Sequence, residues 1–220
     1  MTIRELSTEP ELREAVALQK TIWGWDDADL LPFRMFVVAT KIGGQLLGAF
    51  DNDRMIAFCV AIPGLKPDGK VYLHSHMLGV LPEYRNLGVG RQLKLRQKDD
   101  ALTRGIDLIE WTFDPLDLKN AHFNVERLGA IVRRYVRNQY GVSSSPLHGG
   151  LPTDRLVAEW WIAKPRAKAK VVGRIHVPSD IAGARAKQAG IADQFEQSFA
   201  RGLAVVGVEG THYLLGVLPQ

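Results

Sequence analysis

A short glycine-containing turn has the residue types that bind a phosphate group. Arg85 is followed by Gly88 and Gly90, after an apolar segment and at the start of a helix-like one. Glycines let the backbone approach a ligand closely, and the free amides of a helix N-terminus favour anions. Arg85 and Arg91 add positive charge. A pyrophosphate fits such a turn, although a tight turn before a capped helix explains the same glycines. The pattern matches neither a P-loop nor the dinucleotide fingerprint.

Two histidines precede this turn on a segment predicted to be a strand. His74 and His76 are two residues apart, so we expect both side chains on one face. A neutral imidazole accepts a proton near pH 7, which makes the pair a candidate general base. The alternative is a pair of hydrogen-bonded structural histidines. A zinc site is not predicted, because no third ligand is evident in the sequence.

Other polar residues are weaker candidates for substrate contacts. Asp114 follows a predicted strand that carries Trp111, and its carboxylate suits an ammonium group. Capping of the turn that follows explains Asp114 equally well. The pair Asp154-Arg155 suits either a structural ion pair or a clamp for a substrate carboxylate, and we favour the structural interpretation because nothing in the spacing selects carboxylate binding.

These residues need a strand, the turn and a helix in succession to position them. The apolar run 71–80 predicts the strand, and residues 88–103 predict the helix, with Gly105 as its C-terminal cap. Strands are also expected at 3–6, 45–50, 55–62, 106–113, 156–162, 170–177, 203–208 and 213–217, and helices from 8 to 23 and at 33–40, 120–128, 131–140 and 181–201. This order predicts a mixed α/β fold. We expect a main domain over residues 1–165 and a C-terminal strand-helix-hairpin extension over 166–220 that packs on it.

Composition limits the remaining possibilities. The 220 residues are 46% hydrophobic and 24% charged, which is ordinary for a globular domain. The single cysteine, Cys59, allows no internal disulfide, and its apolar neighbours predict a buried thiol. A net charge of +4 suits an anionic ligand without indicating nucleic acid. Without a signal-peptide pattern or a membrane-spanning apolar run, we expect a cytoplasmic protein.

The segment from His74 to Arg91 resembles the central motif of GNAT acyltransferases. It reads HSHMLGVLPEYRNLGVGR, in which an apolar strand ends in a valine and a short connection leads to the Arg-x-x-Gly-x-Gly turn and its helix. The likeness covers about residues 3–162. The strings WTFDPL, NAHFNVERLG, NQYG and LPTDR further resemble a bacterial GNAT subgroup known mainly as predicted acetyltransferases. The resemblance implies the GNAT fold, an α+β mixed sheet.

The resemblance also implies a co-substrate, which is acetyl-CoA or another short acyl-CoA, and no metal. Backbone groups near Leu78 and Val80 would pair with the pantetheine arm. Asn120 and Asn124 are further candidates for cofactor contacts. The pyrophosphate would be held by the backbone amides of the turn, which belong to Arg85, Asn86, Leu87, Gly88, Val89, Gly90 and Arg91.

In acyl transfer, a base must remove a proton from the acceptor ammonium. His74 and His76 precede Leu78 in the register of the two histidines of serotonin N-acetyltransferases, so the resemblance implies this role for them. Trp23, Trp111 and Asp114 would contact the acceptor, with core packing as the alternative for Trp23.

Members of the family often have a tyrosine that acts as general acid to the leaving thiolate. The resemblance places Val125 at the position of that tyrosine. Tyr135, Tyr140 or a water could substitute for that tyrosine, or the thiolate could leave unaided.

We therefore expect transfer of an acyl group, acetyl or succinyl, to the amine of a small acceptor. Some operons place genes of this subgroup beside N-acylamino-acid racemases, which points to an amino acid by association alone. A protein N-acyltransferase and a non-catalytic acyl-CoA sensor remain alternatives. Nucleic acid and membranes are not expected partners, and a homodimer is left open.

Overall fold

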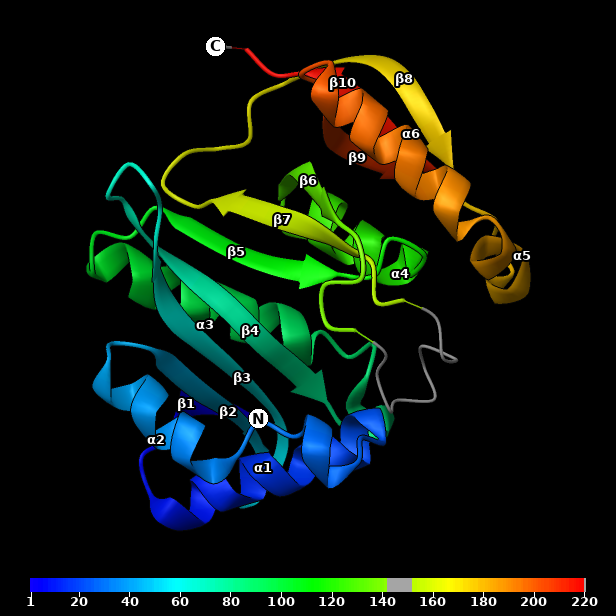
Figure 1. Ribbon diagram of the computed structural model, residues 1–220. Helices are drawn as coiled ribbons and strands as arrows, with labels where there is room; N and C mark the ends of the chain where they lie inside the picture. Colours follow the sequence, from blue (N-terminus) through cyan, green and yellow to red (C-terminus); the bar gives the residue numbers. More distant parts are fainter. Residues whose placement is uncertain (142–151, 220) are drawn as a thin grey trace. The chain divides into compact units, whose positions relative to one another are not determined.

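The computed structural model describes residues 1–141 and 152–219, which belong to two compact units (Figure 1). The first unit contains Met1–Ile109, and the second contains residues 110–141 and 152–219 among those described. Strand β5 (Leu108–Phe113) crosses the boundary. Both units contain helices and strands, which confirms the mixed α/β class.

The first unit is built on four antiparallel strands that are neighbours in chain order. The strands are β1 (Thr2–Glu5), β2 (Gln45–Asp51), β3 (Arg54–Leu65) and β4 (Val71–Val80). Strand β2 pairs with β1 on one side and β3 on the other, and β3 pairs with β4. At the β2–β3 turn, Asn52 has a φ of 52°, a conformation that asparagine tolerates better than most residues.

Helices cover both faces of this sheet. Helices α1 (Glu9–Trp23) and α2 (Phe33–Lys41) lie on one face, and α3 (Val89–Thr103) lies on the other (Figure 1). The first core includes Phe36 and Phe58, and the second places Cys59 against the start of α3. Cys59 is fully buried, as its apolar neighbours predict. The first unit also contains two short 3-10 helices, η1 (Asp27–Asp29) and η2 (Pro82–Tyr84).

The second unit contains the remaining strands in the order β5, β7, β6, β9, β10 and β8. The order differs from the chain order because β9 of the C-terminal segment pairs with β6. The helices are α4 (Leu118–His122), its π-helical continuation η3 (Phe123–Arg127), α5 (Ile181–Ala186) and α6 (Gln188–Ala200). The strands are β6 (Ile131–Val136), β7 (Arg155–Trp161), β8 (Lys170–His176), β9 (Ala204–Glu209) and β10 (His212–Val217).

The helix expected over residues 131–140 is wrong, because this segment forms strand β6. Val132 lies opposite Ala158 of β7 and Val205 of β9, so the segment is held by partners distant in sequence. Its basic residues are also paired: Arg133 contacts Glu159 of β7, and Arg134 donates to Glu110 of β5 at 2.8 Å. The β-branched residues and these non-local pairs outweigh the helical spacing of the basic side chains.

Two other elements differ in extent from the prediction. The helix expected over 181–201 is divided into α5 and α6, and the Asp180 carboxylate caps α5 by accepting from the Gly183 amide at 2.6 Å. Strand β3 continues to Leu65, three residues beyond its predicted end at residue 62. None of the helices in the described residues is long and apolar enough to cross a membrane.

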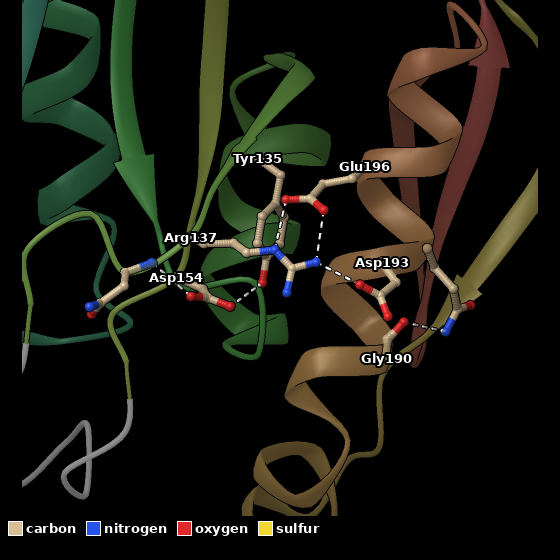
Figure 2. Close-up of polar contacts among 8 residues, drawn as sticks. Tyr135, Arg137, Asp154, Gly190, Asp193 and Glu196 are labelled. Atoms are coloured by element: carbon tan, nitrogen blue, oxygen red, sulfur yellow. Dashed lines mark hydrogen bonds and ion pairs between the residues drawn. The ribbon is translucent and has the colours of Figure 1, made fainter.

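The C-terminal segment packs against the end of β6 through helix α6. Arg137 donates to Glu196 at 2.9 and 2.7 Å and to Asp193 at 2.6 Å (Figure 2). Behind these exposed ion pairs, the buried ring of Phe195 stacks on Tyr135 at a centroid distance of 5.6 Å. The extension therefore shares one compact unit with residues 110–141. The domain boundary expected between residues 165 and 166 stays a prediction.

Candidate active site

The glycine turn joins β4 to α3 through two left-handed residues. Asn86 has a φ of 62° and Gly88 a φ of 81°. Gly88 is the N-cap of α3, and the first amides of a helix have no acceptor within the helix. The amides that follow Gly88 are thus oriented as a helix N-terminus should be to receive an anion.

The side chain of Arg85 fastens the turn to its surroundings. Its Nε donates to the Val80 carbonyl and its guanidinium to the Ile22 carbonyl, both at 3.2 Å. The Arg85 amide donates to the Pro82 carbonyl at 3.2 Å. This amide is already used within the turn, so the candidates for pyrophosphate binding narrow to the amides of residues 86–91.

Gly90 lets α3 lie close to β4. A Cβ atom placed there would stand 3.3 Å from Leu78 Cδ2 and 3.7 Å from Val80 Cγ2. Leu78 and Val80 therefore direct their side chains at the first turn of α3. Their expected contacts with the pantetheine arm are made by backbone groups, and these contacts stay a prediction.

The two histidines lie together on β4. Their ring centroids are 5.9 Å apart, with 39° between the ring planes. The β3–β4 register pairs Met77 with Val60 and Ser75 with Ala61, so His76 is the extra residue of a β-bulge. His74 is half-buried and His76 is exposed.

Although part of the His76 ring meets solvent, the surrounding protein desolvates it and lowers its pKa below the usual 6.5. Near pH 7 this ring is mainly neutral and accepts a proton.

Sequence reasoning missed Lys94, a buried lysine beneath β4. Its side chain is 3% exposed, and its Nζ donates to Ser75 Oγ at 2.7 Å and to Gln97 Oε1 at 3.3 Å. Burial lowers the pKa of Lys94 from the usual 10.5 to about 7. The signal that could have revealed it is its position between Leu93 and Leu95, on the face of α3 that also carries Gly90.

In the second unit, the two asparagines proposed for cofactor contacts have different environments. Asn120 is exposed, whereas Asn124 is 1% exposed and donates to Asn120 Oδ1 at 3.3 Å. Asn120 is the better candidate of the two. Val125 is fully buried within the π-helical turn η3. Because its side chain is apolar, this position offers no hydroxyl group to the leaving thiolate.

Asp114 caps the turn that follows β5. Its Oδ1 accepts from the Leu116 amide at 2.8 Å. Trp111 of β5 is buried and meets Trp160 of β7 edge to face, with centroids 6.2 Å apart. These contacts support the structural interpretation of both residues, and their roles toward an acceptor stay predictions.

The tyrosines considered as substitute acids also have partners. Tyr135 donates to Asp154 Oδ2 at 2.7 Å, and burial raises its pKa far above the usual value (Figure 2). The hydroxyl of Tyr140 lies 3.0 Å from Thr112 Oγ1, and its side chain is 48% exposed. Tyr140 is thus the more accessible proton donor. Asp154 also accepts from the Asn138 amide at 2.8 Å, which makes it a structural residue of the β6–β7 connection.

Trp23 packs in the first unit, where it stacks on Trp25 at 4.7 Å and meets Phe58 edge to face at 5.9 Å. A Cβ at Gly79 would stand 2.8 Å from the Trp23 ring, so this ring lies over β4. Within residues 1–141 and 152–219, no group of three or more His, Cys, Asp or Glu side chains could hold a metal ion.

Comparison with known proteins identifies related folds. Residues 7–130 match the model of the acetyltransferase (GNAT) family. The ribosomal-protein-S18-alanine N-acetyltransferase from Escherichia coli is 20% identical, with 78% of this chain and 99% of that chain covered and a TM-score of 0.57. An aminoglycoside 6'-acetyltransferase type Ii is 21% identical, with 76% and 99% covered and a TM-score of 0.58.

Arabidopsis thaliana Naa50, in complex with the bisubstrate analogue CoA-Ac-MVNAL, is 16% identical, with 72% and 96% covered and a TM-score of 0.54. No curated protein sequence matches the chain.

Proposed function

Because the chain belongs to the acetyltransferase (GNAT) family, we propose that it transfers an acetyl group from acetyl-CoA to the amine of a small acceptor such as an amino acid. The observation that carries this proposal is the histidine pair on β4, whose rings lie 5.9 Å apart and include one with a lowered pKa. Acetyl-CoA is the proposed donor, with succinyl-CoA as the second donor to test.

The glycine turn suits the anionic end of that donor. The amides of residues 86–91 belong to the turn and to the first residues of helix α3, and Arg91 adds a positive charge at the same place. Gly88 holds the left-handed conformation that orients the turn. These features support binding of a pyrophosphate group, because unpaired amides and a helix N-terminus both favour negative charge.

The histidines would take part in one proton transfer. His76, or His74 through it or through water, removes a proton from the acceptor ammonium, and the freed nitrogen attacks the thioester carbonyl. The bond from carbon to sulfur then breaks, and coenzyme A leaves as a thiolate that takes up a proton. A thiol has an ordinary pKa of about 8.5, so its anion is a fair leaving group even without a side-chain acid.

The buried Val125 favours a second candidate function, a non-catalytic acyl-CoA-binding protein. A protein that only binds acyl-CoA needs no residue to protonate the leaving thiolate, and a valine at the usual tyrosine position fits that case. Tyr140 or water would serve this step in an enzyme.

The experiment that separates these functions is an acceptor screen. The protein is incubated with acetyl-CoA or succinyl-CoA and a panel of amines, free amino acids and short peptides, and the free thiol is measured. Thiol release that depends on a small amine supports the proposal. Release with peptides alone indicates a protein N-acyltransferase, and tight coenzyme A binding without release from any acceptor indicates the non-catalytic function.

A further inference from the structure

Lys94 is a buried titratable group of the first unit that the proposed reaction does not use. It lies on α3 and reaches up to β4, where its Nζ donates to Ser75 Oγ at 2.7 Å. Ser75 is 4% exposed and is placed between His74 and His76 in the chain. The lysine therefore contacts the strand at the residue that separates the two histidines.

Neighbouring polar groups hold the lysine in place. Gln97, which is fully buried one turn further along α3, accepts from Lys94 at 3.3 Å. Gln97 Nε2 in turn lies 3.9 Å from Cys59 Sγ on β3, and its backbone carbonyl accepts from Gln45 Nε2 at 3.1 Å. Side chains from three strands and one helix thus form a buried polar cluster around the Lys94–Ser75 hydrogen bond.

One face of α3 joins this cluster to the glycine turn. Gly90 and Lys94 are four residues apart, so they lie one above the other on the helix. Gly90 packs against Leu78 and Val80, and Lys94 bonds to Ser75 further back on the same strand. Helix α3, which begins at the candidate phosphate site, therefore packs against strand β4, which carries the candidate base.

The β-bulge makes this contact matter for His76. The extra residue of a bulge has no partner opposite it, so its direction depends on how its neighbours are held. Met77 is held by its pairing with Val60, and Ser75 is held both by its pairing with Ala61 and by Lys94. We propose that Lys94 is a positioning residue, which fixes Ser75 and so directs the His76 ring. This inference rests on the proposed role of His76 in the reaction.

A purely structural role explains a lysine here poorly. A buried ammonium group is costly, and replacing a buried polar cluster by apolar residues of similar volume is often neutral or stabilising. Methionine matches the length and flexibility of the lysine stem and carries no charge. A buried lysine that costs stability is more simply explained by a contribution to the site.

The first test compares Lys94→Met with Arg96→Met, a control on the exposed side of the same helix. Turnover is measured as thiol release from acetyl-CoA with the best acceptor from the screen. We expect the folded Lys94→Met protein to lose about tenfold or more in kcat, because small displacements of catalytic groups have large effects. Its KM for acetyl-CoA should stay near that of the wild type. Arg96→Met should leave all these quantities unchanged.

The second test uses Ser75→Ala and the double variant. If Lys94 acts through Ser75, the two single changes lower kcat to a similar extent and their combination adds little. Ser75→Ala removes one oxygen atom, so it serves the test even if Lys94→Met does not fold.

A third measurement does not depend on catalysis. The ring C–H signals of His76, assigned by their loss in His76→Gln, are followed by NMR through a pH titration. We expect Lys94→Met to shift these signals and their titration midpoint, whereas Arg96→Met leaves them in place. If the histidines prove unnecessary for turnover, this measurement still decides whether Lys94 positions the ring.

Unchanged His76 signals in folded Lys94→Met, together with wild-type kcat, would overturn the inference. Loss of stability with normal kcat in the folded fraction would also overturn it, because that result identifies Lys94 as a structural residue. Additive losses in the double variant would show that Lys94 does not act through Ser75.

Discussion

His74 and His76 bring their rings to within 5.9 Å of each other, on a strand where His76 is the extra residue of a bulge. A bulge re-aims one side chain relative to its neighbours, which is why such irregularities are common beside active sites. A proton taken by one ring is therefore within short reach of the other, directly or through one water.

Replacing either histidine by glutamine should lower turnover by at least about tenfold, since general-base help is typically worth about 100- to 10,000-fold. Glutamine keeps most of the volume and polarity of the ring but does not titrate. Affinity for coenzyme A should change little. The acidic limb of the pH–rate profile should be altered, because one of the two rings whose protonation inactivates the base at low pH is no longer present. His176→Gln, a change of an exposed histidine on β8, is the matched control. Wild-type turnover and pH profile in the folded double variant would end the assignment.

Replacing Gly88 by valine should weaken coenzyme A binding by about tenfold or more, which is about 1.4 kcal/mol. Gly88 has a φ of 81°, which a β-branched residue adopts only with strain. Gly105→Val is a close control, because Gly105 has a φ of 71° at the other end of α3 and is equally open. Both variants should lose stability, but only Gly88→Val should lose affinity in calorimetry. Equal affinity in the two variants would remove the turn from the site.

The stability margin of Lys94→Met, which is its free energy of unfolding minus that of the wild type, should be higher at about pH 6.5 than at about pH 9. The folded chain loses the Lys94 proton near pH 7, whereas the unfolded chain holds it up to about 10.5. Between these values unfolding takes up a proton, so raising the pH stabilises the wild type. Lys94→Met has no titrating group at this position, so its stability does not gain this contribution as the pH rises.

Urea unfolding of both proteins at the two pH values measures the margin. Cys59, which contacts the same cluster, has a pKa raised by burial to about 12 but is common to both proteins. A margin that stays constant across this range would show that Lys94 keeps an ordinary pKa.

Phe195→Ala should destabilise the second unit by about 3–5 kcal/mol, as expected for a fully buried aromatic ring. The ring stacks on Tyr135 and meets Tyr213 edge to face at 5.1 Å. Arg137→Ala, which breaks the exposed ion pairs with α6, should cost much less than Phe195→Ala, because solvent screens exposed ion pairs.

Amide exchange should be slow in α6 and β9 of the wild type and faster in Phe195→Ala. A larger loss in Arg137→Ala than in Phe195→Ala would mean that ion pairs, and not apolar packing, hold the extension. Rapid exchange throughout the wild-type segment would contradict the packed arrangement.

Local patterns predicted most of the elements that position the candidate site. The apolar run of β4, the glycine turn and α3 lie within a few residues of their expected bounds, because each is determined by neighbouring residues. The helix expected at 131–140 was wrong because Arg133 and Arg134 are paired with carboxylates far away in sequence. No local pattern carries that information.

The bulge and the contact of the buried lysine depend on the same kind of distant information. Strict alternation places Ser75 opposite to the two histidines, but it does not predict the register shift at His76. The leucines on either side of Lys94 are a local signal of burial, but its hydrogen bond to Ser75 depends on the sheet against which α3 packs.

The hydroxyl of Tyr213 on β10 donates to the carbonyl of Pro115 at 2.8 Å, across 98 residues of sequence. Pro115 lies in the turn that Asp114 caps after β5. During synthesis the hydrogen bond from Tyr213 to this turn cannot form until residue 213 has left the ribosome. Since chains fold from the N-terminus as they emerge, the glycine turn and the histidine strand can form first, and the turn after β5 is completed late.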